Sequence, residues 1–270
     1  VLSNQKLTLR IEQALTSVKG KIAAAALQVR ATSLDNSAGT LLSDGDLQVT
    51  VDGLLTNQNK GLIKAAGQLT LNSNGLDNQG GTLLGSTGLS IDLGATPADL
   101  NNQSGLINTK GVLSIAHLRD LNNQKGEISS VHSFSLTGNT LDNRGGNLIS
   151  NDQLTLNATR LNNQGGLVSG WNKLAVAGGS LDNSQEGTLS SLLGNLNINL
   201  SGALINNAKG GLAGLGDVSI TAASLDNSNG IVTSGGKQTL TMTQGAINNA
   251  SGGLIESSGT LAISATSLNN

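Results

Sequence analysis

The chain of 270 residues contains no cysteine, which excludes disulfide bonds and thiolate metal sites. Aromatic residues are nearly as scarce, with one Phe, one Trp and no Tyr. A globular core of this size ordinarily uses large rings, because they bury more apolar surface than other side chains. Their scarcity favours a thin, repetitive core filled by aliphatic side chains.

Charged residues are few and balanced, with 15 Lys and Arg against 17 Asp and Glu and no run of like charge. Nothing in this distribution attracts nucleic acid or an acidic membrane surface. No apolar run approaches membrane-spanning length, and residues 1–14 lack the charged-then-apolar pattern of a signal peptide. We therefore expect no nucleic-acid partner and no membrane insertion by this segment.

The chain is instead rich in glycine, with 37 residues, and in one recurring tripeptide, [Leu/Ile]-[Asp/Asn/Thr]-Asn. The tripeptide begins at residues 34, 55, 76, 100, 121, 141, 161, 181, 205, 225, 247 and 268. Successive copies are 20 to 24 residues apart. An internal repeat of this period is typical of a solenoid.

Each repeat consists of short apolar segments separated by turn residues. A Gly usually follows the tripeptide, and an aliphatic residue comes next, at Leu41, Leu62, Leu83, Ile107, Ile128, Leu148, Val168, Leu212, Val232 and Leu254. After a second turn comes an alternating pair, such as Leu47 and Val49 or Leu154 and Leu156. Period-two alternation bounded by Gly, Ser and Asn predicts β-strands, and no 3.6-residue apolar stripe spans a repeat.

One repeat cannot bury its apolar side alone, but stacked copies form a continuous core. Equivalent residues then lie above one another on parallel strands about 4.8 Å apart. The third residue of the tripeptide is always Asn, whose amide can donate to one neighbour and accept from the other. The predicted ladder comprises Asn36, Asn57, Asn78, Asn102, Asn123, Asn143, Asn163, Asn183, Asn207, Asn227 and Asn249.

The second residue of the tripeptide supports the stacked arrangement. It is Asp in five of the twelve copies, yet no two consecutive copies both carry Asp. Like charges directly opposite one another on paired strands are destabilising. Stacking in register therefore predicts this spacing.

Together these patterns predict an all-β parallel solenoid of about 12–13 rungs, each of ~20–21 residues. Residues 1–14 are predicted as an entering strand and residues 15–270 as rungs, with 15–33 as a degenerate first rung. No linker or change of composition interrupts residues 1–270, so we expect a single repeat domain. The pattern is unfinished at Leu268, which predicts a fragment of a longer protein.

The Leu-Asp-Asn-Gln-Gly-Gly unit at residues 76–81, with its aliphatic residue and alternating pair, resembles the repeats of filamentous haemagglutinins. The resemblance covers roughly residues 15–270. Such repeats occur in large Gram-negative exoproteins that two-partner systems secrete, including adhesins and contact-dependent growth inhibition toxins. The resemblance implies a right-handed parallel β-helix, an outer-membrane transporter as partner, and a secreted or outer-cell-surface location.

A leucine-rich repeat is the alternative fold, because Leu154, Leu156 and Asn163 superficially fit its pattern of Leu and Asn. That repeat needs further Leu positions and a helical or 3₁₀ segment on its convex side. The Gly-rich half of each repeat in this chain provides neither, which favours the β-helix.

No catalytic or metal site is predicted, and no cofactor. Cleavage of glycosides needs two carboxylates that flank the sugar. The only closely spaced acids, Asp44 and Asp46, align with Ala66 and Gln68 of the next rung, so no acidic cluster forms across rungs. The Gly-Gly-x-Gly-x-Asp calcium repeat does not occur either.

Irregular positions are the candidates for partner contact, because a regular solenoid presents the same chemistry at every rung. Pro97 lies in an inserted corner and cannot donate to a strand ladder. His117, Arg119 and Asp120 fall at a similar corner of the next rung, so we expect one raised patch with Pro97. Trp171 lies at a different corner and is expected to be a separate, exposed candidate.

These observations favour a structural stalk that extends an adhesive or toxin-delivering region of a secreted exoprotein from the cell. In the alternative, the segment itself binds a receptor on the target-cell surface or a glycan. A polysaccharide-active enzyme is the third possibility. An exposed aromatic or apolar patch would distinguish a binding module from a stalk.

Overall fold

The computed structural model describes residues 1–270, and every regular element in it is a β-strand. The fold is a β-solenoid of about 13 turns in which neighbouring strands run parallel, as the repeat period predicted. No helix in the structure is long and apolar enough to cross a membrane. The chain divides into two compact units, unit 1 (Val1–Phe134) and unit 2 (Ser135–Asn270), which are described in turn.

Each turn of unit 1 contains a first strand, a second strand and a short strand. The first strands are β5 (Thr40–Ser43), β8 (Leu62–Ala65), β11 (Thr82–Gly85), β14 (Leu106–Thr109) and β17 (Glu127–Ser130). The second strands are β1 (Leu2–Arg10), β3 (Lys21–Ala31), β6 (Leu47–Val51), β9 (Gln68–Asn72), β12 (Gly88–Asp92) and β15 (Val112–Ala116). The short strands are β2 (Leu15–Thr16), β4 (Leu34–Asp35), β7 (Leu55–Thr56), β10 (Leu76–Asp77), β13 (Ala98–Asn101) and β16 (Leu118–Asn122).

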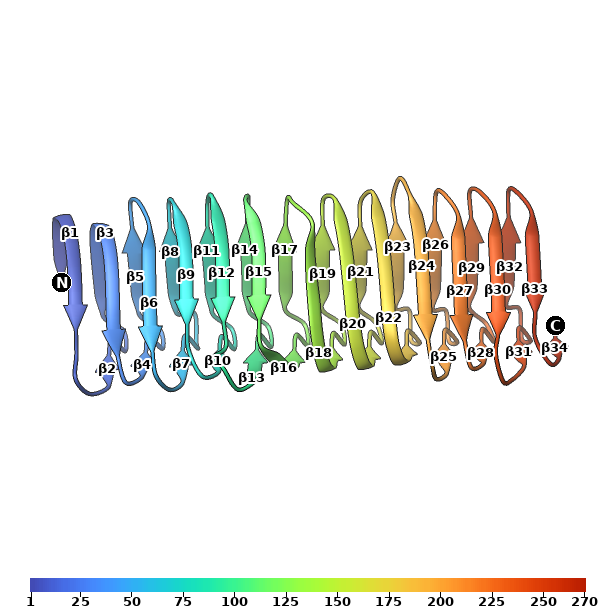
Figure 1. Cartoon of the computed structure of the whole chain (residues 1–270), viewed down its shortest axis with the longest axis horizontal. Helices are drawn as coiled ribbons and strands as arrows, with labels where there is room; N and C mark the ends of the chain where they lie inside the picture. The colour runs from blue at the N-terminus through green and yellow to red at the C-terminus, as the bar shows by residue number, and fades with distance from the viewer. The chain divides into compact units, whose positions relative to one another are not determined.

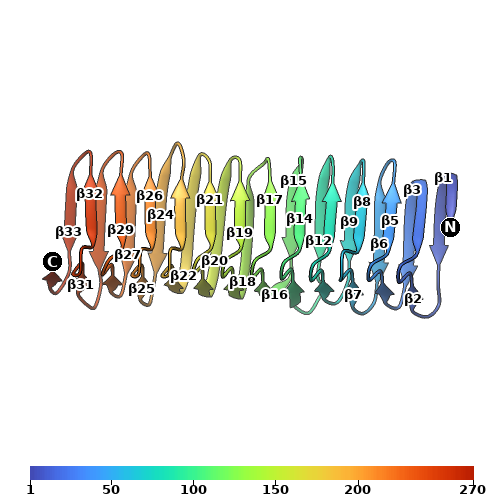
Figure 2. The same ribbon diagram turned by 180° about the vertical axis from the view of Figure 1, so that it is seen from behind.

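Each strand of unit 1 pairs with its equivalent one turn later. The second strands lie side by side in chain order (Figure 1), and Figure 2 shows the first strands from behind. Strand β3 is long enough to pair with both β5 and β6, so it provides two strands of its turn. The run of alanines from Ala23 to Ala26 is therefore extended and not helical, as the repeat spacing predicted.

Unit 2 repeats the arrangement, although in its first turns the second and short strands merge. The first strands are β19 (Asn147–Ser150), β21 (Leu167–Gly170), β23 (Thr188–Ser191), β26 (Gly211–Gly214), β29 (Ile231–Ser234) and β32 (Leu254–Ser257). The merged strands are β18 (Phe134–Asp142), which begins at the last residue of unit 1, β20 (Gln153–Asn162) and β22 (Lys173–Asp182). The remaining second strands are β24 (Asn195–Leu200), β27 (Val218–Ala222), β30 (Gln238–Met242) and β33 (Leu261–Ser264). The remaining short strands are β25 (Leu204–Ile205), β28 (Leu225–Asp226), β31 (Ile247–Asn248) and β34 (Leu268–Asn269).

The core of each unit is a stack of aliphatic side chains. In unit 1, Leu69, Leu89 and Leu113 face one another on successive second strands and are at most 4% exposed. Leu174 and Leu196 occupy the same position in unit 2 and are fully buried. Burial of each such side chain stabilises the fold by roughly 1.5–3 kcal/mol. Aliphatic stacks fill this narrow interior, which explains why the core needs so few aromatic side chains.

The turn after the tripeptide varies in length by one residue, and this corrects two predicted core positions. Asn59 and Lys60 both adopt left-handed backbone, with φ of 55° and 68°, in a turn one residue longer than its neighbours. The extra residue shifts the following strand, so Ile63 and not Leu62 pairs with Leu41 and enters the core. The same shift corrects Leu254, since Ile255 pairs with Val232. A one-residue shift reverses which side chains face inward.

Candidate functional site

The buried asparagines of unit 1 form a continuous amide ladder. Nδ2 of Asn36 donates to Oδ1 of Asn57 at 2.8 Å, and the same hydrogen bond, at 2.7–2.8 Å, connects Asn57 to Asn78, Asn78 to Asn102 and Asn102 to Asn123. All five side chains are fully buried. Leaving such a buried amide without partners costs about 1–3 kcal/mol, so the ladder constrains how successive turns stack.

The ladder amides of unit 1 from Asn36 to Asn102 also bond to the backbone of two turns. Nδ2 of Asn78 donates to the backbone oxygen of Gly81 in its own turn and to that of Leu106 in the next, both at 3.3 Å. One side chain therefore hydrogen-bonds both the turn that follows its own short strand and the first strand of the next turn of the solenoid.

Unit 2 contains an equivalent ladder, with one correction to the predicted membership. It comprises Asn143, Asn163, Asn183, Asn206, Asn227, Asn249 and Asn270, joined by hydrogen bonds of 2.7–2.8 Å.

Asn206 occupies the ladder position that was predicted for Asn207. Leu204-Ile205-Asn206 and Ile205-Asn206-Asn207 both fit the tripeptide, and the structure selects the first, because Leu204 pairs with Leu181 and is fully buried. Asn207 instead begins a long turn in which Ala208 and Lys209 have left-handed backbone.

The glycine that lies three residues after ladder asparagines such as Asn78 and Asn227 is required because the backbone of the preceding turn approaches closely there. A Cβ atom at Gly81 would lie 1.8 Å from the backbone oxygen of Asn57, and one at Gly230 would lie 1.9 Å from that of Asn206. These distances are far below any real carbon–oxygen contact. Part of the high glycine content of the chain is therefore explained by the absence of space for a Cβ atom at this position of the repeat.

A second polar series runs outside the ladder and explains the spacing of the aspartates. The carboxylate of Asp226 accepts hydrogen bonds from Asn207 in the turn before, at 2.7 Å, and from Asn248 in the turn after, at 3.1 Å. Asp77 lies in the same way between the amides of Gln58 and Asn101. Asp77 and Asp226 each have amide donors on the turns before and after, where a second carboxylate would repel them.

The pKa of Asp226 lies below its ordinary value. Burial by itself raises this pKa, but hydrogen bonds from Ser228, Asn207 and Asn248 favour the charged carboxylate and outweigh burial. Because the folded-state pKa is lowered, the carboxylate stabilises the fold above the unfolded-state pKa of about 3.9. This stabilisation is lost as the pH falls through the folded-state pKa.

We expect Asp226→Asn to reduce the sensitivity of unit 2 to acid. Between about pH 5 and about pH 3, the unfolding temperature of the unmodified chain should fall further than that of the variant. An asparagine is tolerated at this position, since Asn248 one turn later accepts a hydrogen bond from Asn269 at 3.1 Å. Asp44→Asn, at an exposed turn of unit 1, is the control and should keep the full decline. Equal declines in all three proteins would contradict the assignment.

The two closely spaced acids have a structural place in unit 1 and do not form part of an acidic cluster. Oδ1 of Asp46 accepts a hydrogen bond from the backbone nitrogen of Gln68, one turn later, at 2.8 Å. Asp217 makes the same contact with the backbone of Lys237 in unit 2. Asp44 is exposed, and no group of three or more His, Asp or Glu side chains in the structure could hold a metal ion.

The structure brings Pro97 and His117 together on neighbouring turns of unit 1. The backbone nitrogen of Ala98, next to Pro97, donates to the backbone oxygen of His117 at 3.0 Å. Nδ1 of His117 lies 2.7 Å from Oδ1 of Asp92. This contact and the hydrogen bond from the backbone of Gly94 lower the pKa of Asp92.

Arg119 completes the same corner. It donates two hydrogen bonds to Asp99, at 2.8 and 2.6 Å, and its Nε lies 3.5 Å from a carboxylate oxygen of Asp120. Asp92 and Asp99 were not predicted as members of this corner, although an acidic residue about one period before His117 or Arg119 is a signal in the sequence that could have identified them. All these groups are exposed, so the ion pairs define local shape more than they add stability.

Trp171 lies in the turn between β21 and β22 of unit 2 and is 44% exposed. The backbone nitrogen of Leu193, one turn later, donates to the backbone oxygen of Trp171 at 2.7 Å. Leu192, Leu193 and Leu215 are also exposed, in the equivalent turns that follow. Trp171, which was predicted to be exposed, therefore begins an apolar edge over three successive turns. The leucines of this edge were not predicted, because the repeat pattern does not distinguish an exposed leucine at a turn from a buried one on a strand.

The model of the haemagglutinin repeat family matches residues 7–60, 192–251 and 233–270. The chain contains a repeat region of the filamentous haemagglutinin type. No curated protein and no solved structure matches this haemagglutinin-repeat chain. The family match points to an adhesin-like repeat segment of a secreted or cell-surface exoprotein, and the match and the fold together point to a structural repeat region rather than an enzyme.

Proposed function

We propose that this haemagglutinin-repeat chain is a stalk segment, which holds an adhesive or toxin-delivering region of its exoprotein away from the cell surface. The observation that carries the proposal is the amide ladder, which runs without interruption from Asn36 to Asn123 in unit 1 and from Asn143 to Asn270 in unit 2. Each turn is attached to the next by side-chain and backbone hydrogen bonds together. Such a stack resists extension and needs no partner to keep its form.

The same construction suits secretion by an outer-membrane transporter of the two-partner type in a Gram-negative bacterium. Each turn contacts only its neighbours, so folding can propagate turn by turn as the chain emerges. The chain has no disulfide whose formation would have to accompany export. The transporter as partner and the outer cell surface as location are parts of this proposal, as is membership of an adhesin or a contact-dependent growth inhibition toxin.

Deletion of one complete turn tests the stalk. Removal of residues 147–166 from the full-length exoprotein joins Gly146 to Leu167, which pairs with Asn147 and so preserves the register. We expect this variant to be exported and to retain delivery or adhesion, because the remaining turns still stack. Removal of residues 147–156 is the matched control, and it should abolish protease resistance because it leaves half a turn. Loss of adhesion in the full-turn variant, with protease resistance retained, would show that the segment itself binds.

A receptor-binding role is the second candidate, and the proximity of Pro97, His117 and Arg119 in unit 1 favours it. Removal of residues 95–98 deletes most of the inserted corner, and Trp171→Ala removes the ring from the apolar edge of unit 2. Equal capture of the intact and altered chains by target-cell surface extract would assign the segment the role of a passive spacer.

We expect the purified chain to release no reducing or unsaturated ends from acidic or neutral polysaccharides, with or without calcium. Glycoside cleavage requires two carboxylates that flank the sugar, whereas Asp46 accepts a hydrogen bond from the backbone of Gln68 and Asp44 has no acidic neighbour one turn away. The measurement is an assay of end groups over time. Sustained release that Asp44→Asn or Asp46→Asn abolishes would contradict the structural role.

A further inference from the structure

The sequence contains two Asn-Gly pairs, Asn74-Gly75 in unit 1 and Asn229-Gly230 in unit 2. An asparagine before glycine can lose its amide nitrogen spontaneously, because the glycine has no side chain to hinder attack by its backbone nitrogen. Both pairs follow a serine and precede an aliphatic residue, so their reactivities in an unfolded chain are closely similar. Both asparagines are exposed and both glycines are buried. A difference in reactivity in the folded chain must therefore come from the local backbone.

The peptide group between Asn229 and Gly230 is fixed by hydrogen bonds on both sides. Its carbonyl oxygen, on Asn229, accepts from the backbone nitrogen of Lys209 at 2.7 Å. Its N–H, on Gly230, donates to the backbone oxygen of Asn227 at 2.9 Å. The nitrogen that would attack the side chain is thus engaged with another acceptor, and rotation of the peptide group would break both hydrogen bonds.

The peptide group between Asn74 and Gly75 makes no hydrogen bond to the rest of the chain, although Gly75 is buried. The groups on either side of it are bonded. The nitrogen of Asn74 donates to the backbone oxygen of Gly53 at 2.9 Å, and the oxygen of Gly75 accepts from the backbone nitrogen of Leu55 at 3.1 Å. A buried backbone N–H without an acceptor is rare in folded proteins. This peptide group can therefore rotate towards the side chain of Asn74 without breaking a hydrogen bond of its own.

We propose that Asn74 is a site of spontaneous deamidation whose product loosens this corner of unit 1, whereas the fold protects Asn229. The backbone nitrogen of Gly75 forms a bond to Cγ of Asn74 as the bond from Cγ to Nδ2 breaks. The proton of the Gly75 N–H passes through solvent to the leaving nitrogen, which departs as ammonia. One water molecule then opens the succinimide at either of its two carbonyl groups, which gives aspartate or isoaspartate at position 74.

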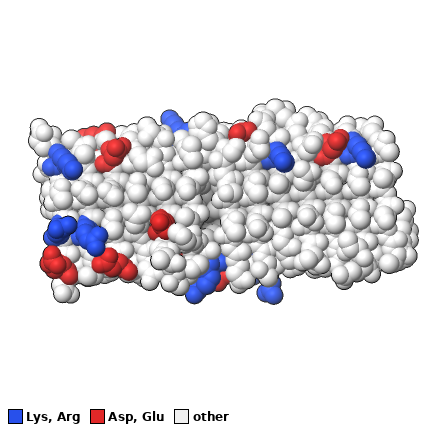
Figure 3. Space-filling model, in the orientation of Figure 1, with Lys and Arg blue, Asp and Glu red and all other residues white.

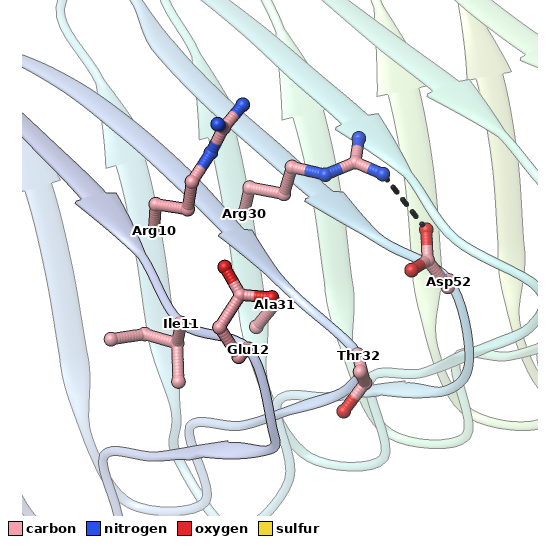
Figure 4. A pocket seen from close by; sticks show the side chains of 7 residues that line it. All are labelled: Arg10, Ile11, Glu12, Arg30, Ala31, Thr32 and Asp52. Carbon is pink, nitrogen blue, oxygen red and sulfur yellow. Dashed lines mark hydrogen bonds and ion pairs between the residues drawn. The ribbon is translucent and has the colours of Figure 1, made fainter.

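Either product adds a carboxylate between two existing ones. Charged side chains are few on the face of the molecule in Figure 3, but Asp52 and Asp92 line the same hollow as Asn74. Their cationic partners lie in other turns, since Asp52 reaches Arg30 one turn earlier at 3.5 Å (Figure 4) and Asp92 contacts His117 one turn later at 2.7 Å. No cationic side chain lines the hollow itself. Because like charges on neighbouring parallel strands are destabilising, the new carboxylate weakens the stacking of these turns.

Isoaspartate also lengthens the backbone, because the chain then passes through the former side-chain carbon. The hydrogen bonds to Gly53 and from Leu55 lie on opposite sides of the lengthened segment, so both cannot keep their geometry. Gly94 and Thr96, from the inserted corner that contains Pro97, line the same hollow. Deamidation would therefore alter the surface on which the candidate contact residues of unit 1 lie.

The test follows both asparagines in the folded full chain during storage in mildly alkaline buffer. Peptide mass spectrometry measures conversion of each amide to the acid, and methylation by a protein isoaspartate methyltransferase measures the isoaspartate formed. We expect Asn74 to react at least about tenfold faster than Asn229, which corresponds to a barrier lower by about 1.4 kcal/mol. In concentrated urea the two rates should become similar, because only the local sequence then acts.

Asn74→Gln is the matched variant, because attack on its longer side chain would form a larger and less favourable ring. This variant should lose most of the isoaspartate signal, whereas Asn229→Gln should retain it. Hydrogen exchange of the backbone amide of Leu55 should become faster in the stored unmodified chain and stay unchanged in stored Asn74→Gln.

Three results would overturn the proposal. Reaction of Asn229 in the folded chain at the same rate as Asn74, or faster, would show that the hydrogen bonds of the peptide groups do not control deamidation. A rate difference of the same size in urea would assign it to the local sequence and not to the fold. Unchanged exchange of the Leu55 amide after full conversion of Asn74 would show that the product leaves this corner intact.

Discussion

Gly81→Ala is expected to destabilise unit 1 by about 3 kcal/mol, the upper part of the range for overpacking in a tight interior. The added Cβ would lie 1.8 Å from the backbone oxygen of Asn57 and 2.7 Å from Oδ1 of Asn78. The backbone at Gly81 is not left-handed, so the cost comes from collision between turns and not from the conformation of the residue itself. The turns would have to separate, which would weaken the ladder contact between Asn57 and Asn78.

The preceding glycine provides the matched control. Gly80 is left-handed, with φ of 62°, but a Cβ there would meet nothing within 4 Å. Asn229, at the equivalent position of unit 2, adopts φ of 55°. Gly80→Asn should therefore change the free energy of unfolding by less than about 0.5 kcal/mol. Chemical denaturation of the two variants measures the difference, and similar stabilities would refute the argument from close approach.

Asn163→Leu is expected to destabilise unit 2 by about 1–3 kcal/mol for each buried group that it leaves unpaired. The fully buried amide of Asn163 accepts a hydrogen bond from Asn143 and donates to Asn183, both at 2.7 Å. It also donates to the backbone oxygens of Gly166 and Thr188, at 3.0 and 3.2 Å. Leucine is similar in size but replaces none of these hydrogen bonds, and it leaves Oδ1 of Asn183 without its ladder donor.

Asn162→Thr controls for the loss of an asparagine at the neighbouring position. Thr56 already occupies the equivalent place in unit 1, paired with Asp35 and Asp77, so threonine is compatible with the strand there. We expect its effect on the thermal unfolding midpoint to be small. Hydrogen exchange of backbone amides near residues 163–188 should increase in Asn163→Leu and not in Asn162→Thr. Unchanged exchange in both would mean that the ladder contributes little to stability.

The local pattern of the sequence was sufficient for the fold class and for most of the ladder. Apolar alternation, Gly-containing turns and an asparagine in every repeat have one common explanation in stacked parallel strands, and ten of the eleven predicted ladder residues lie in the two ladders. This succeeded because each turn of a solenoid contacts only its neighbours, so the repeat period contains most of the tertiary information.

Which residues at the turns belong to the ladder or to the core could be decided only from the tertiary structure. The choice between Asn206 and Asn207, and between Ile63 and Leu62, turns on one additional left-handed residue, and the two registers are equally consistent with the sequence pattern. Burial of Leu204 and Ile63 decides between them, and burial depends on the neighbouring turns.

For the same reason, the repeat pattern did not predict the surface features. The pairing of His117 with Asp92 and the apolar edge that begins at Trp171 each join residues one period or more apart. Their distances and exposure depend on the length of the turns between them. Turn length has little influence on the periodic apolar pattern, but it determines which side chains meet at the surface.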